Sequence, residues 1–259
     1  MKSIICFDVD MTLLNHKDWS IPESTMETIE KLRPNNWIVL ATGRDMDSKF
    51  SQEIRDQIRP DAIIHLNGTK ITVGSQMIYE HFFDRKLAEE IAAWIETTPY
   101  SIGLTSGGED YYIHPETVMR HDQELWGSCY RNFKDFYTLP PEKIRTLAFI
   151  GNEEGANALA SQFPQVKVHL FAEKRGADVV EADVSKAMGL KKLCGYYNVP
   201  IEKTVAFGDS MNDYDIIRAA GTGVAMGNAM EELKAAADYV TDAVDKDGIR
   251  NACIYLGLV

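Results

Sequence analysis

The sequence predicts an α/β protein: a doubly wound, mainly parallel sheet with an α+β module inserted into it. Three observations support this prediction. Short apolar runs alternate with helical patterns at the start of the chain, the same alternation returns at its end, and the middle follows neither pattern. Alternating strands and helices indicate parallel βαβ units with right-handed crossovers. We therefore expect residues 1–82 and 183–259 to form one core and residues 83–182 to form an inserted cap.

The first part of the chain predicts the centre of the sheet. The continuous apolar run at residues 3–7 is typical of a strand buried on both faces. Similar runs follow it, separated by stretches whose apolar residues recur at helical spacing. The expected elements are a strand at 3–7, a helix at 22–32 capped by Ser20 or Ser24, a strand at 37–41, a helix at 45–58 and a strand at 62–66.

The middle section predicts a separate α+β module, and the end of the chain returns to the first pattern. Residues 114–140 are rich in aromatic residues and show no regular period, so we expect them to be irregular. The other expected elements are a hairpin at 69–79, helices at 87–98, 154–162, 186–197, 212–220 and 229–236, and strands at 102–104, 111–113, 146–151, 166–171, 204–207, 222–226 and from 239.

Composition and charge limit the classes of partner. Of the 259 residues, 45% are hydrophobic and 25% are charged, which is ordinary for a soluble globular protein. The net charge of −12 disfavours nucleic acid and anionic membranes as main partners. The apolar start is too short for a signal peptide, and no apolar run approaches the roughly 20 residues of a membrane span. We expect a cytoplasmic protein, as a monomer or a weak homodimer.

The cysteines are also typical of a cytoplasmic protein. The chain has four cysteines, and no two of them are close enough to form a CxxC metal or redox motif. We therefore expect reduced structural thiols at Cys6, Cys129, Cys194 and Cys253.

Two acidic residues follow the first predicted strand. In an extended segment, residues i and i+2 point to the same side, so Asp8 and Asp10 can face one site. Two such carboxylates repel each other unless a cation or a shared proton lies between them. Taken alone, the pair is also compatible with acids of a turn or a helix cap.

Shorter signals follow the second and third strands. Thr42, Gly43 and Arg44 combine a hydroxyl, a glycine and the start of the next predicted helix, which together make an anion-binding corner. Thr-Gly turns are common, so this signal depends on its position in the sheet. Asn67 ends the third strand, where an Asn-Gly pair alone indicates a turn.

An acidic loop follows the predicted strand at 204–207. Asp209, Asn212 and Asp213 place two carboxylates and a carboxamide within five residues. Hard oxygen ligands of this kind suit Mg²⁺, which prefers octahedral coordination. The alternative is a helix cap followed by an acidic first turn.

The clusters together indicate a reaction. Because ligands bind beyond the carboxyl ends of parallel strands, we expect these side chains to meet at one edge of the sheet, with Lys186 at the start of its helix. A carboxylate nucleophile, a second carboxylate, a metal-binding loop, a hydroxyl and a lysine suit attack by aspartate on phosphorus. Asp10 can protonate the leaving oxygen and then deprotonate the attacking water.

These four clusters resemble the four motifs of the haloacid dehalogenase superfamily. Their order and spacing are similar to the Cof-type, class IIB hydrolases, whose α/β cap lies between the second and third motifs. The resemblance covers essentially the whole chain. It implies a Rossmann-like core with an inserted cap. It also implies a Mg²⁺-dependent phosphatase that hydrolyses small phosphorylated metabolites, with sugar phosphates favoured, through an aspartyl-phosphate intermediate.

The resemblance also implies a role for each matching residue. Asp8 is the nucleophile and a metal ligand, Asp10 is the general acid/base and gives the metal its backbone carbonyl, Asp209 is the second carboxylate ligand, and Asp213 belongs to the metal shell. Phosphate is held by Val9, Thr42, Gly43, Lys186 and Asn212, and the candidates for substrate contacts are Arg44, Asn67, Arg120 and Arg175. Further cap candidates are His121, Arg131, Glu173 and Lys174.

Two positions depart from the family pattern. Met11 stands where a glycine is common, and a bulky side chain near the entrance is expected to narrow the substrate range. Ala187 also replaces a glycine, which suggests that the backbone there does not need a positive φ.

Three alternatives remain open. A phosphomutase of the same superfamily would return the phosphate from the aspartate to the substrate before water intercepts it. A phosphate-binding protein without activity would keep the fold alone. A signalling receiver domain also uses an aspartate, a threonine and a lysine, but it spans only about one standard domain and its acids are usually adjacent.

Overall fold

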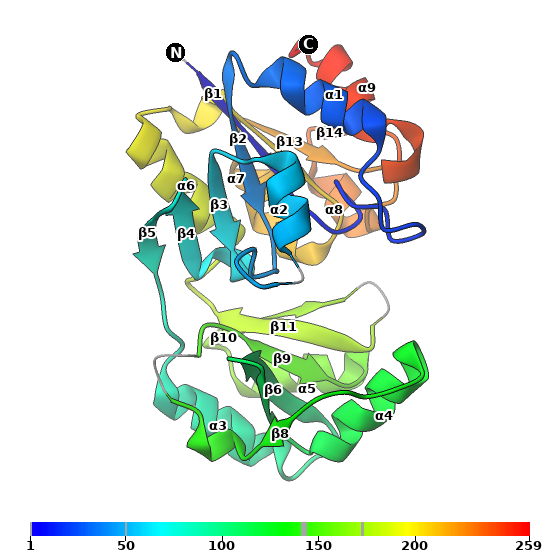
Figure 1. The fold of residues 1–259 in the computed structure, drawn as a ribbon. Coiled ribbons are helices and arrows are strands. Elements are labelled where there is room, and N and C mark those ends of the chain that lie inside the picture. Colours follow the sequence, from blue (N-terminus) through cyan, green and yellow to red (C-terminus); the bar gives the residue numbers. More distant parts are fainter. Residues whose placement is uncertain (1, 50, 141–143, 172–173) are drawn as a thin grey trace. The chain divides into compact units, whose positions relative to one another are not determined.

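The computed structural model describes residues 2–49, 51–140, 144–171 and 174–259 of the chain. Its contacts divide the chain into two compact units. The core unit contains Met1–Glu80 and Val184–Val259, and the inserted unit contains His81–Asp183 (Figure 1). Among the described residues, no helix is both long enough and apolar enough to cross a membrane.

The core unit is built on one sheet. In the described residues this sheet has eight strands in the order β14-β13-β12-β1-β2-β3-β4-β5. The pairs from β14 to β3 are parallel, whereas β3, β4 and β5 pair antiparallel. The strands are β1 (Ser3–Phe7), β2 (Asn36–Ala41), β3 (Ala62–His65), β4 (Lys70–Val73), β5 (Gln76–Glu80), β12 (Thr204–Gly208), β13 (Thr222–Ala225) and β14 (Tyr239–Val240).

Helices cover both faces of this sheet (Figure 1). Ile5 and Phe7 of β1 point to one face, where they join a hydrophobic cluster with α1 and α9. Ile4 and Cys6 point to the other, where they join a cluster with α6, α7 and α8. The core helices are α1 (Glu23–Leu32), α2 (Gln52–Ile58), α6 (Lys186–Tyr197), α7 (Tyr214–Ala219), α8 (Glu231–Ala236) and α9 (Gly248–Tyr255). Short 3-10 turns are η1 (Leu66–Gly68), η4 (Ile201–Lys203), η5 (Met211–Asp213) and η6 (Val244–Lys246).

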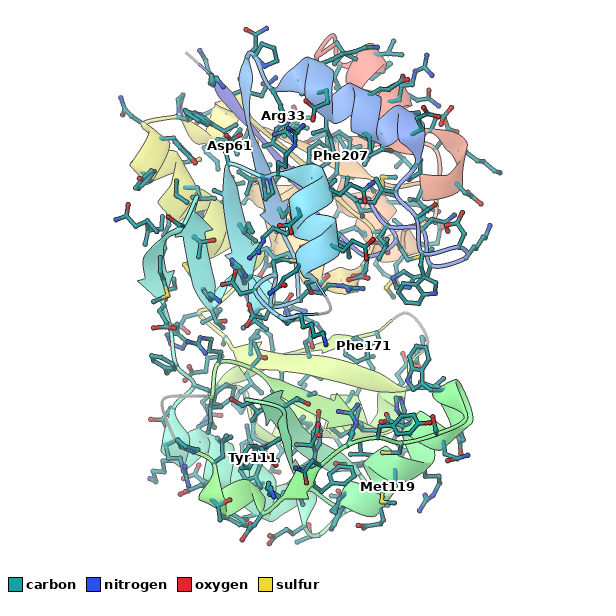
Figure 2. All side chains as sticks on the ribbon, viewed as in Figure 1. Arg33, Asp61, Tyr111, Met119, Phe171 and Phe207 are labelled. Atoms are coloured by element: carbon teal, nitrogen blue, oxygen red, sulfur yellow. The ribbon has the colours of Figure 1, made fainter. Side chains whose placement is uncertain are left out.

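This arrangement confirms the predicted doubly wound, mainly parallel α/β sheet. Both faces of β1 are buried, which explains why its sequence is a continuous apolar run and does not alternate. Phe207 of β12, labelled in Figure 2, stacks on Phe7 with ring centroids 5.0 Å apart.

The inserted unit has its own sheet and hydrophobic core. The described strands follow the order β10-β11-β9-β6-β7-β8, and all neighbours pair antiparallel except β7 and β8. Helices α3 and α5 pack on this sheet through a cluster that includes Ile91, Phe149 and Leu159. The elements are α3 (Arg85–Ile95), β6 (Ser101–Ser106), β7 (Glu109–Ile113), α4 (Pro115–Trp126), β8 (Phe133–Lys134), η2 (Phe136–Thr138), β9 (Leu147–Ile150), α5 (Glu153–Gln162), β10 (Val166–Leu170) and β11 (Gly176–Glu181).

The prediction of a helix over residues 45–58 is wrong in its first half, because α2 begins only at Gln52. Asp45 accepts a hydrogen bond from the backbone nitrogen of Asp47, an Asx-type turn that competes with helix formation. His65 holds the same segment, because its Nδ1 accepts from the backbone nitrogen of Met46. Lys70 bridges both aspartates.

The prediction that residues 114–140 are irregular is also wrong, because α4 occupies Pro115–Trp126. Only Val118 and Asp122 are buried on this helix, and its apolar residues form just two pairs, Val118-Met119 and Leu125-Trp126, seven residues apart among polar ones. The signals that could have predicted this helix lie at its ends. Pro115 stands in the first turn, and Gly127, which follows the last turn, has the left-handed conformation with φ 73°.

Two further elements were not predicted, and the predicted side-chain cap of α1 was wrong. Strand β11 lies between β9 and β10, and α9 ends the chain. Helix α1 begins after Pro22 without a side-chain cap, and the hydroxyl of Ser24 donates to Asp247 across the core unit. Neither serine caps it, because Ser20 bonds to Asp18 in the preceding turn.

Candidate active site

The candidate site lies where β1 and β12 end. The two strands pair in parallel, with Phe7 opposite Phe207, so the residues that follow them leave the sheet at the same edge. The backbone nitrogen of Asp8 continues this pairing and donates to the carbonyl of Phe207 at 3.0 Å. Asp209 directly follows β12, two residues after Phe207. The register of the two strands therefore brings Asp8 and Asp209 together.

Lys186 ties the third acid to the first. It is the first residue of α6 and is fully buried. Its Nζ donates to Oδ1 of Asp8 at 2.7 Å and to Oδ1 of Asp213 at 2.6 Å. Burial lowers the pKa of Lys186, but Asp213 and Asp8 outweigh it and raise that pKa above its usual value. The lysine is therefore a buried cation and not a solvated surface side chain.

The start of α6 is held close to η1. Ser185 caps the helix by accepting from the backbone nitrogen of Met188 at 3.1 Å. A Cβ atom on Gly68 would lie 2.3 Å from the carbonyl oxygen of Ser185, so only glycine permits this approach. The glycine of the predicted Asn-Gly turn thus positions Lys186.

Asp8, Asp209 and Asp213 form what we name the acidic cluster. One carboxylate oxygen from each lies within 4.8 Å of the other two, and all three residues are buried. Three carboxylates against one lysine leave an excess of negative charge. Burial raises the pKa of Asp8 to about 8, although Lys186 opposes the shift. Burial, together with the charge of Asp8, also raises the pKa of Asp209.

The acidic cluster fits a divalent cation. Its donors are hard carboxylate oxygens gathered within reach of one ion, which is the ligand chemistry of Mg²⁺. A cation there would offset the repulsion that raises the pKa values of Asp8 and Asp209. Among the described residues a second group, Asp45, Asp47 and His65, is also close together, but Lys70 already forms ion pairs with both of its acids.

Hydrogen bonds orient the acidic cluster. Oδ2 of Asp213 accepts from the backbone nitrogens of Asp209 at 3.1 Å and Ser210 at 3.2 Å, which fixes the loop after β12. The buried hydroxyl of Thr12 donates to Oδ1 of Asp209 at 3.0 Å. Sequence reasoning assigned no role to Thr12, and its place two residues after Asp10 was the available signal.

Asp10 has different partners. Nε and Nη2 of Arg44 donate to its two carboxylate oxygens at 2.7 and 2.6 Å, and Nε2 of His16 lies 2.7 Å from Oδ1. Burial raises the pKa of Asp10, but the hydrogen bonds from His16 and Arg44 outweigh it and lower the pKa below its ordinary range. Arg44, a predicted substrate contact, therefore binds Asp10. The sequence analysis did not identify His16, whose ring stacks on Trp19.

Met11 and Ala187 can now be placed. Met11 has φ 56°, in the left-handed region that glycine prefers, and its side chain packs against the hydrophobic cluster of the core unit. The expectation that this side chain narrows the substrate range stays a prediction. Ala187 lies in α6 and has no positive φ, as predicted.

The remaining core candidates surround the same loops. Asn212 donates from Nδ2 to Oδ1 of Asn67 at 3.0 Å, which links η5 to η1. Thr42 is buried, and its Oγ1 accepts from the backbone nitrogen of Arg44 at 3.0 Å. Gly43 lies in the bend after β2, and the carbonyl of Val9 accepts from the turn that follows.

The inserted unit holds the other candidates. Arg120, His121, Lys174 and Arg175 line a common pocket. Arg131 does not join them, because it pairs with Asp122 and Asp110 within the unit. Glu173 lies outside the described residues.

Comparison with known proteins identifies the family. Residues 5–253 match the model of the haloacid dehalogenase-like hydrolases. The chain is 33% identical to "Putative phosphatase YkrA" of Bacillus subtilis, over 99% of this chain and 98% of that one. It is 26% identical to the 5-amino-6-(5-phospho-D-ribitylamino)uracil phosphatase YitU of the same organism, over 95% and 94% of the two chains.

A solved structure agrees with this family. The structure of a subclass IIB sugar phosphatase of the superfamily superposes with a TM-score of 0.87 at 27% identity, covering 100% of both chains. The resemblance drawn from the motifs is thereby confirmed: the chain belongs to the haloacid dehalogenase-like hydrolases and is a Cof-type phosphatase of that family.

Proposed function

We propose that this phosphatase uses Mg²⁺ and forms an aspartyl-phosphate on Asp8. The observation that carries the proposal is the setting of Asp8. It is held by the buried Lys186 at 2.7 Å and shares the acidic cluster with Asp209 and Asp213. A nucleophilic carboxylate beside a cation site and a lysine suits attack on a phosphate that carries negative charge.

In the first step an oxygen of Asp8 attacks phosphorus and the bond from phosphorus to the leaving oxygen breaks. The leaving oxygen takes a proton from the carboxyl group of Asp10. In the second step water attacks the phosphorus, Asp10 takes a proton from that water, and the bond from phosphorus to Asp8 breaks. Inorganic phosphate leaves and Asp8 is restored.

The other site residues stabilise the charge on the phosphate or hold the substrate. Lys186 offsets the charge that builds up on the phosphoryl oxygens, together with the hydroxyl of Thr42 and the amides of Val9 and Gly43. Asn212 and Asn67 hold the substrate at the mouth of the site. A Mg²⁺ ion held by Asp8, Asp209, Asp213 and the backbone carbonyl of Asp10 would supply further charge neutralisation.

His16 and Arg44 together lower the pKa of Asp10, and Arg44 is the one that contacts both of its oxygens. While both oxygens of Asp10 accept from Arg44, its carboxylate is ionised and suited to take a proton from water. Donation of a proton in the first step requires that Arg44 release at least one oxygen. We propose that the substrate's leaving group competes for Arg44 and so frees Asp10.

The substrates we propose are small phosphate monoesters, with sugar phosphates favoured. Two similar proteins support this: one is named for a phosphorylated ribitylamino compound and the other is a sugar phosphatase. We propose that residues of the inserted unit select the leaving group and that the enzyme acts in the cytoplasm, where such metabolites occur.

The test measures phosphate release from sugar phosphates, nucleotides, cofactor phosphates and p-nitrophenyl phosphate, with Mg²⁺ and with EDTA. Asp8→Asn should abolish release, because an amide is a poor nucleophile, and Asp10→Asn should cripple it on substrates with poor leaving groups. Mg²⁺-independent release, or release by Asp8→Asn after mass spectrometry excludes deamidation, would contradict the mechanism. Formation of a phosphorylated isomer without free phosphate would indicate a mutase.

A further inference from the structure

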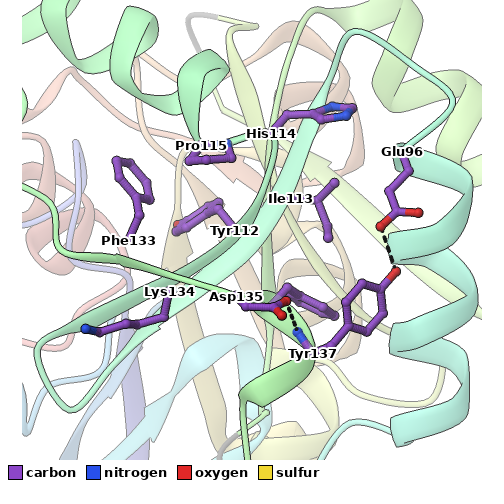
Figure 3. A pocket seen from close by; sticks show the side chains of 10 residues that line it. Glu96, Tyr112, Ile113, His114, Pro115, Phe133, Lys134, Asp135 and Tyr137 are labelled. Atoms are coloured by element: carbon purple, nitrogen blue, oxygen red, sulfur yellow. Dashed lines mark hydrogen bonds between the residues drawn. The ribbon is translucent and has the colours of Figure 1, made fainter.

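The inserted unit contains a cavity of about 510 Å³, shown in Figure 3. Its two carboxylates already accept hydrogen bonds from Tyr137: Glu96 from the hydroxyl at 3.0 Å and Asp135 from the backbone nitrogen at 3.0 Å. None of its lining residues, all of which are described, has a buried polar atom without a partner. A contact whose purpose the fold does not explain lies instead in the core unit, between His16 and Asp10.

The two oxygens of Asp10 have unequal numbers of donors. Oδ1 accepts from Nε2 of His16 at 2.7 Å and from Nη2 of Arg44 at 2.6 Å, whereas Oδ2 accepts only from Nε of Arg44, at 2.7 Å. Nε2 carries the hydrogen of the first bond, because an ionised carboxylate can only accept. Each carboxylate oxygen has two lone pairs, so the described donors occupy both on Oδ1 and leave one open on Oδ2.

His16 and Arg44 play different parts in the proposed mechanism. Arg44 must release at least one oxygen before Asp10 can donate a proton. Its guanidinium group is a rigid planar fork, so loss of one bond also loosens the other. The side chain of Asp10 is 34% exposed, and it can turn toward solvent when Arg44 lets go. The bond from His16 to Oδ1 does not depend on Arg44 and can keep the carboxyl group in place.

The imidazole of His16 is itself held by Trp19. The two rings stack with centroids 4.5 Å apart and planes 21° apart. Trp19 is 56% exposed and has φ 58°, a left-handed conformation that a bulky side chain rarely adopts. Glycine would fill this position with less strain. Backbone strain of this kind clusters at functional sites, and support of the imidazole gives the exposed tryptophan such a function.

The turn that carries both rings is closed and tied to the core unit. The backbone nitrogen of Asn15 donates to the carbonyl of Ser20 at 2.9 Å, and that of Trp19 donates to the carbonyl of Asn15 at 2.8 Å. Nζ of Lys17 forms an ion pair of 2.5 Å with Asp245 in η6. The imidazole is therefore presented from a fixed turn and not from a free loop.

We propose that His16 is a positioning residue for Asp10: it holds Oδ1 while Arg44 releases Oδ2, so that Oδ2 is the oxygen that gives and takes the proton. With a proton on Oδ2, Oδ1 becomes a neutral acceptor, and the bond from His16 weakens but still aligns the carboxyl group. His16 itself transfers no proton. This inference rests on the proposed function, since it assigns the acid/base step of Asp10 to one oxygen.

Two esters with different leaving groups test this role. p-Nitrophenyl phosphate releases a stable anion that needs little protonation, whereas benzyl phosphate, which is of similar size, releases an alkoxide unless an acid supplies a proton. The measured quantity is kcat/KM, which covers the reaction only as far as departure of the leaving group. A variant that merely damages the fold should lower kcat/KM for both esters by the same factor.

Two substitutions separate the hydrogen bond from the stacking. His16→Phe keeps a ring that can stack on Trp19 and removes the N–H donor, whereas His16→Gln keeps a donor of similar reach and loses the ring. We expect His16→Phe to lower kcat/KM at least about tenfold for benzyl phosphate and at most about threefold for p-nitrophenyl phosphate, because a displaced catalytic group costs up to about a hundredfold. His16→Gln should restore most of the loss. Equal losses on both esters, no loss, or no restoration by glutamine overturns the proposal.

Asp10→Asn separates this proposal from the mechanism. If Asp10→Asn loses activity selectively on benzyl phosphate and His16→Phe does not, the positioning role fails and the proposed function stands. If Asp10→Asn keeps the wild-type kcat/KM on benzyl phosphate, the acid/base role of Asp10 fails, and the role of His16 is overturned with it. Adding His16→Phe to Asp10→Asn should cause no further loss, because His16 acts through Asp10; an additive loss contradicts the proposal.

A crystal structure of the Arg44→Gln protein tests the geometry without turnover. Oδ1 of Asp10 should remain within about 3.2 Å of Nε2 of His16, the range of an ordinary hydrogen bond, although both bonds from Arg44 are gone. An Asp10 side chain that has turned away from His16 overturns the proposal, whatever the activity of the wild-type protein.

Discussion

Replacing Lys186 by methionine should destabilise the core unit strongly when no metal is bound. The methionine keeps most of the side-chain volume and removes the charge. Lys186 is fully buried and makes ion pairs of 2.7 Å and 2.6 Å with Asp8 and Asp213. Removing one partner of a buried ion pair costs about 3–5 kcal/mol, because the remaining charge is left without compensation.

The size of the effect can be measured by thermal unfolding in EDTA. A loss of 1 kcal/mol lowers Tm by roughly 2–4 °C for a domain of this size, so we expect a fall of roughly 6–20 °C at pH 8. The fall should shrink at pH 5.5, where the raised pKa values of Asp8 and Asp209 favour their protonated forms, and again when Mg²⁺ is added at pH 8. Both changes relieve the same uncompensated charge.

Lys191→Met is the matched control. Lys191 lies on the same helix, α6, but is exposed, so its loss should change Tm by no more than 1–2 °C, since exposed substitutions stay within about 0.5 kcal/mol. If Lys186→Met unfolds at the same temperature as Lys191→Met in EDTA, Lys186 does not compensate the acidic cluster. If its deficit is large but responds to neither pH nor Mg²⁺, the cause is packing and the electrostatic reasoning is wrong.

Three further predictions concern the same site. The pKa of Asp8, raised to about 8, means that the folded protein keeps this proton to higher pH than the unfolded chain. Asp8 alone should therefore cost the metal-free protein up to about 1.4 kcal/mol of stability per pH unit between roughly pH 4 and pH 8, and Mg²⁺ should raise Tm more at pH 8 than at pH 5.5; an equal Mg²⁺ effect at both would contradict this. Thr12→Val should cost about 1.5–3 kcal/mol in urea unfolding with EDTA, because a buried carboxylate loses its donor, whereas Thr12→Ser should retain most of that stability. Gly68→Ala places a Cβ 2.3 Å from the carbonyl of Ser185 at φ +109°, so it should lower Tm and phosphate release together, whereas Gly195→Ala in α6, with no atom within 4 Å, should leave both intact.

The fold was predictable where buried positions form a recognisable apolar pattern in the sequence. Strands of a parallel sheet with helices on both faces are apolar throughout, so β1, β2, β3 and β12 were visible as continuous runs. Helix α4 left a weaker trace, because it buries only Val118 and Asp122 and most of its residues are polar. Helices of that kind are marked by their ends, and the sequence analysis did not use the end signals at Pro115 and Gly127.

The sequence analysis did not predict strand β11, for a related reason. Although it lies inside the sheet of the inserted unit, it begins at Gly176 and carries Asp178, both of which are depleted in strands. Its neighbours on both sides supply the pairing that its sequence does not announce. Tertiary context, and not local propensity, determines this element.

The convergence of the candidate site followed from topology. Parallel strands end at one edge of a sheet, so Asp8 and Asp209 had to be neighbours once β1 and β12 were paired. Hydrogen bonds across the chain were not predictable in this way. The bond from Thr12 to Asp209 joins residues that are 197 positions apart, and no local pattern specifies it.

Sequence spacing predicted that Asp8 and Asp10 face one site, but it could not predict that the site would treat them oppositely. Burial raises the pKa of Asp8 to about 8, whereas the hydrogen bonds from His16 and Arg44 outweigh burial and lower that of Asp10. A nucleophile must be ionised, and an acid must hold a proton. The metal-free site therefore shifts each carboxyl group toward the form opposite to the one that the first step needs. Under the mechanism we propose, a cation at the acidic cluster must first ionise Asp8, and the substrate must first weaken the hydrogen bonds of His16 and Arg44 to Asp10. Binding of metal and substrate would then reverse both protonation states, so that the enzyme becomes reactive only when both are present.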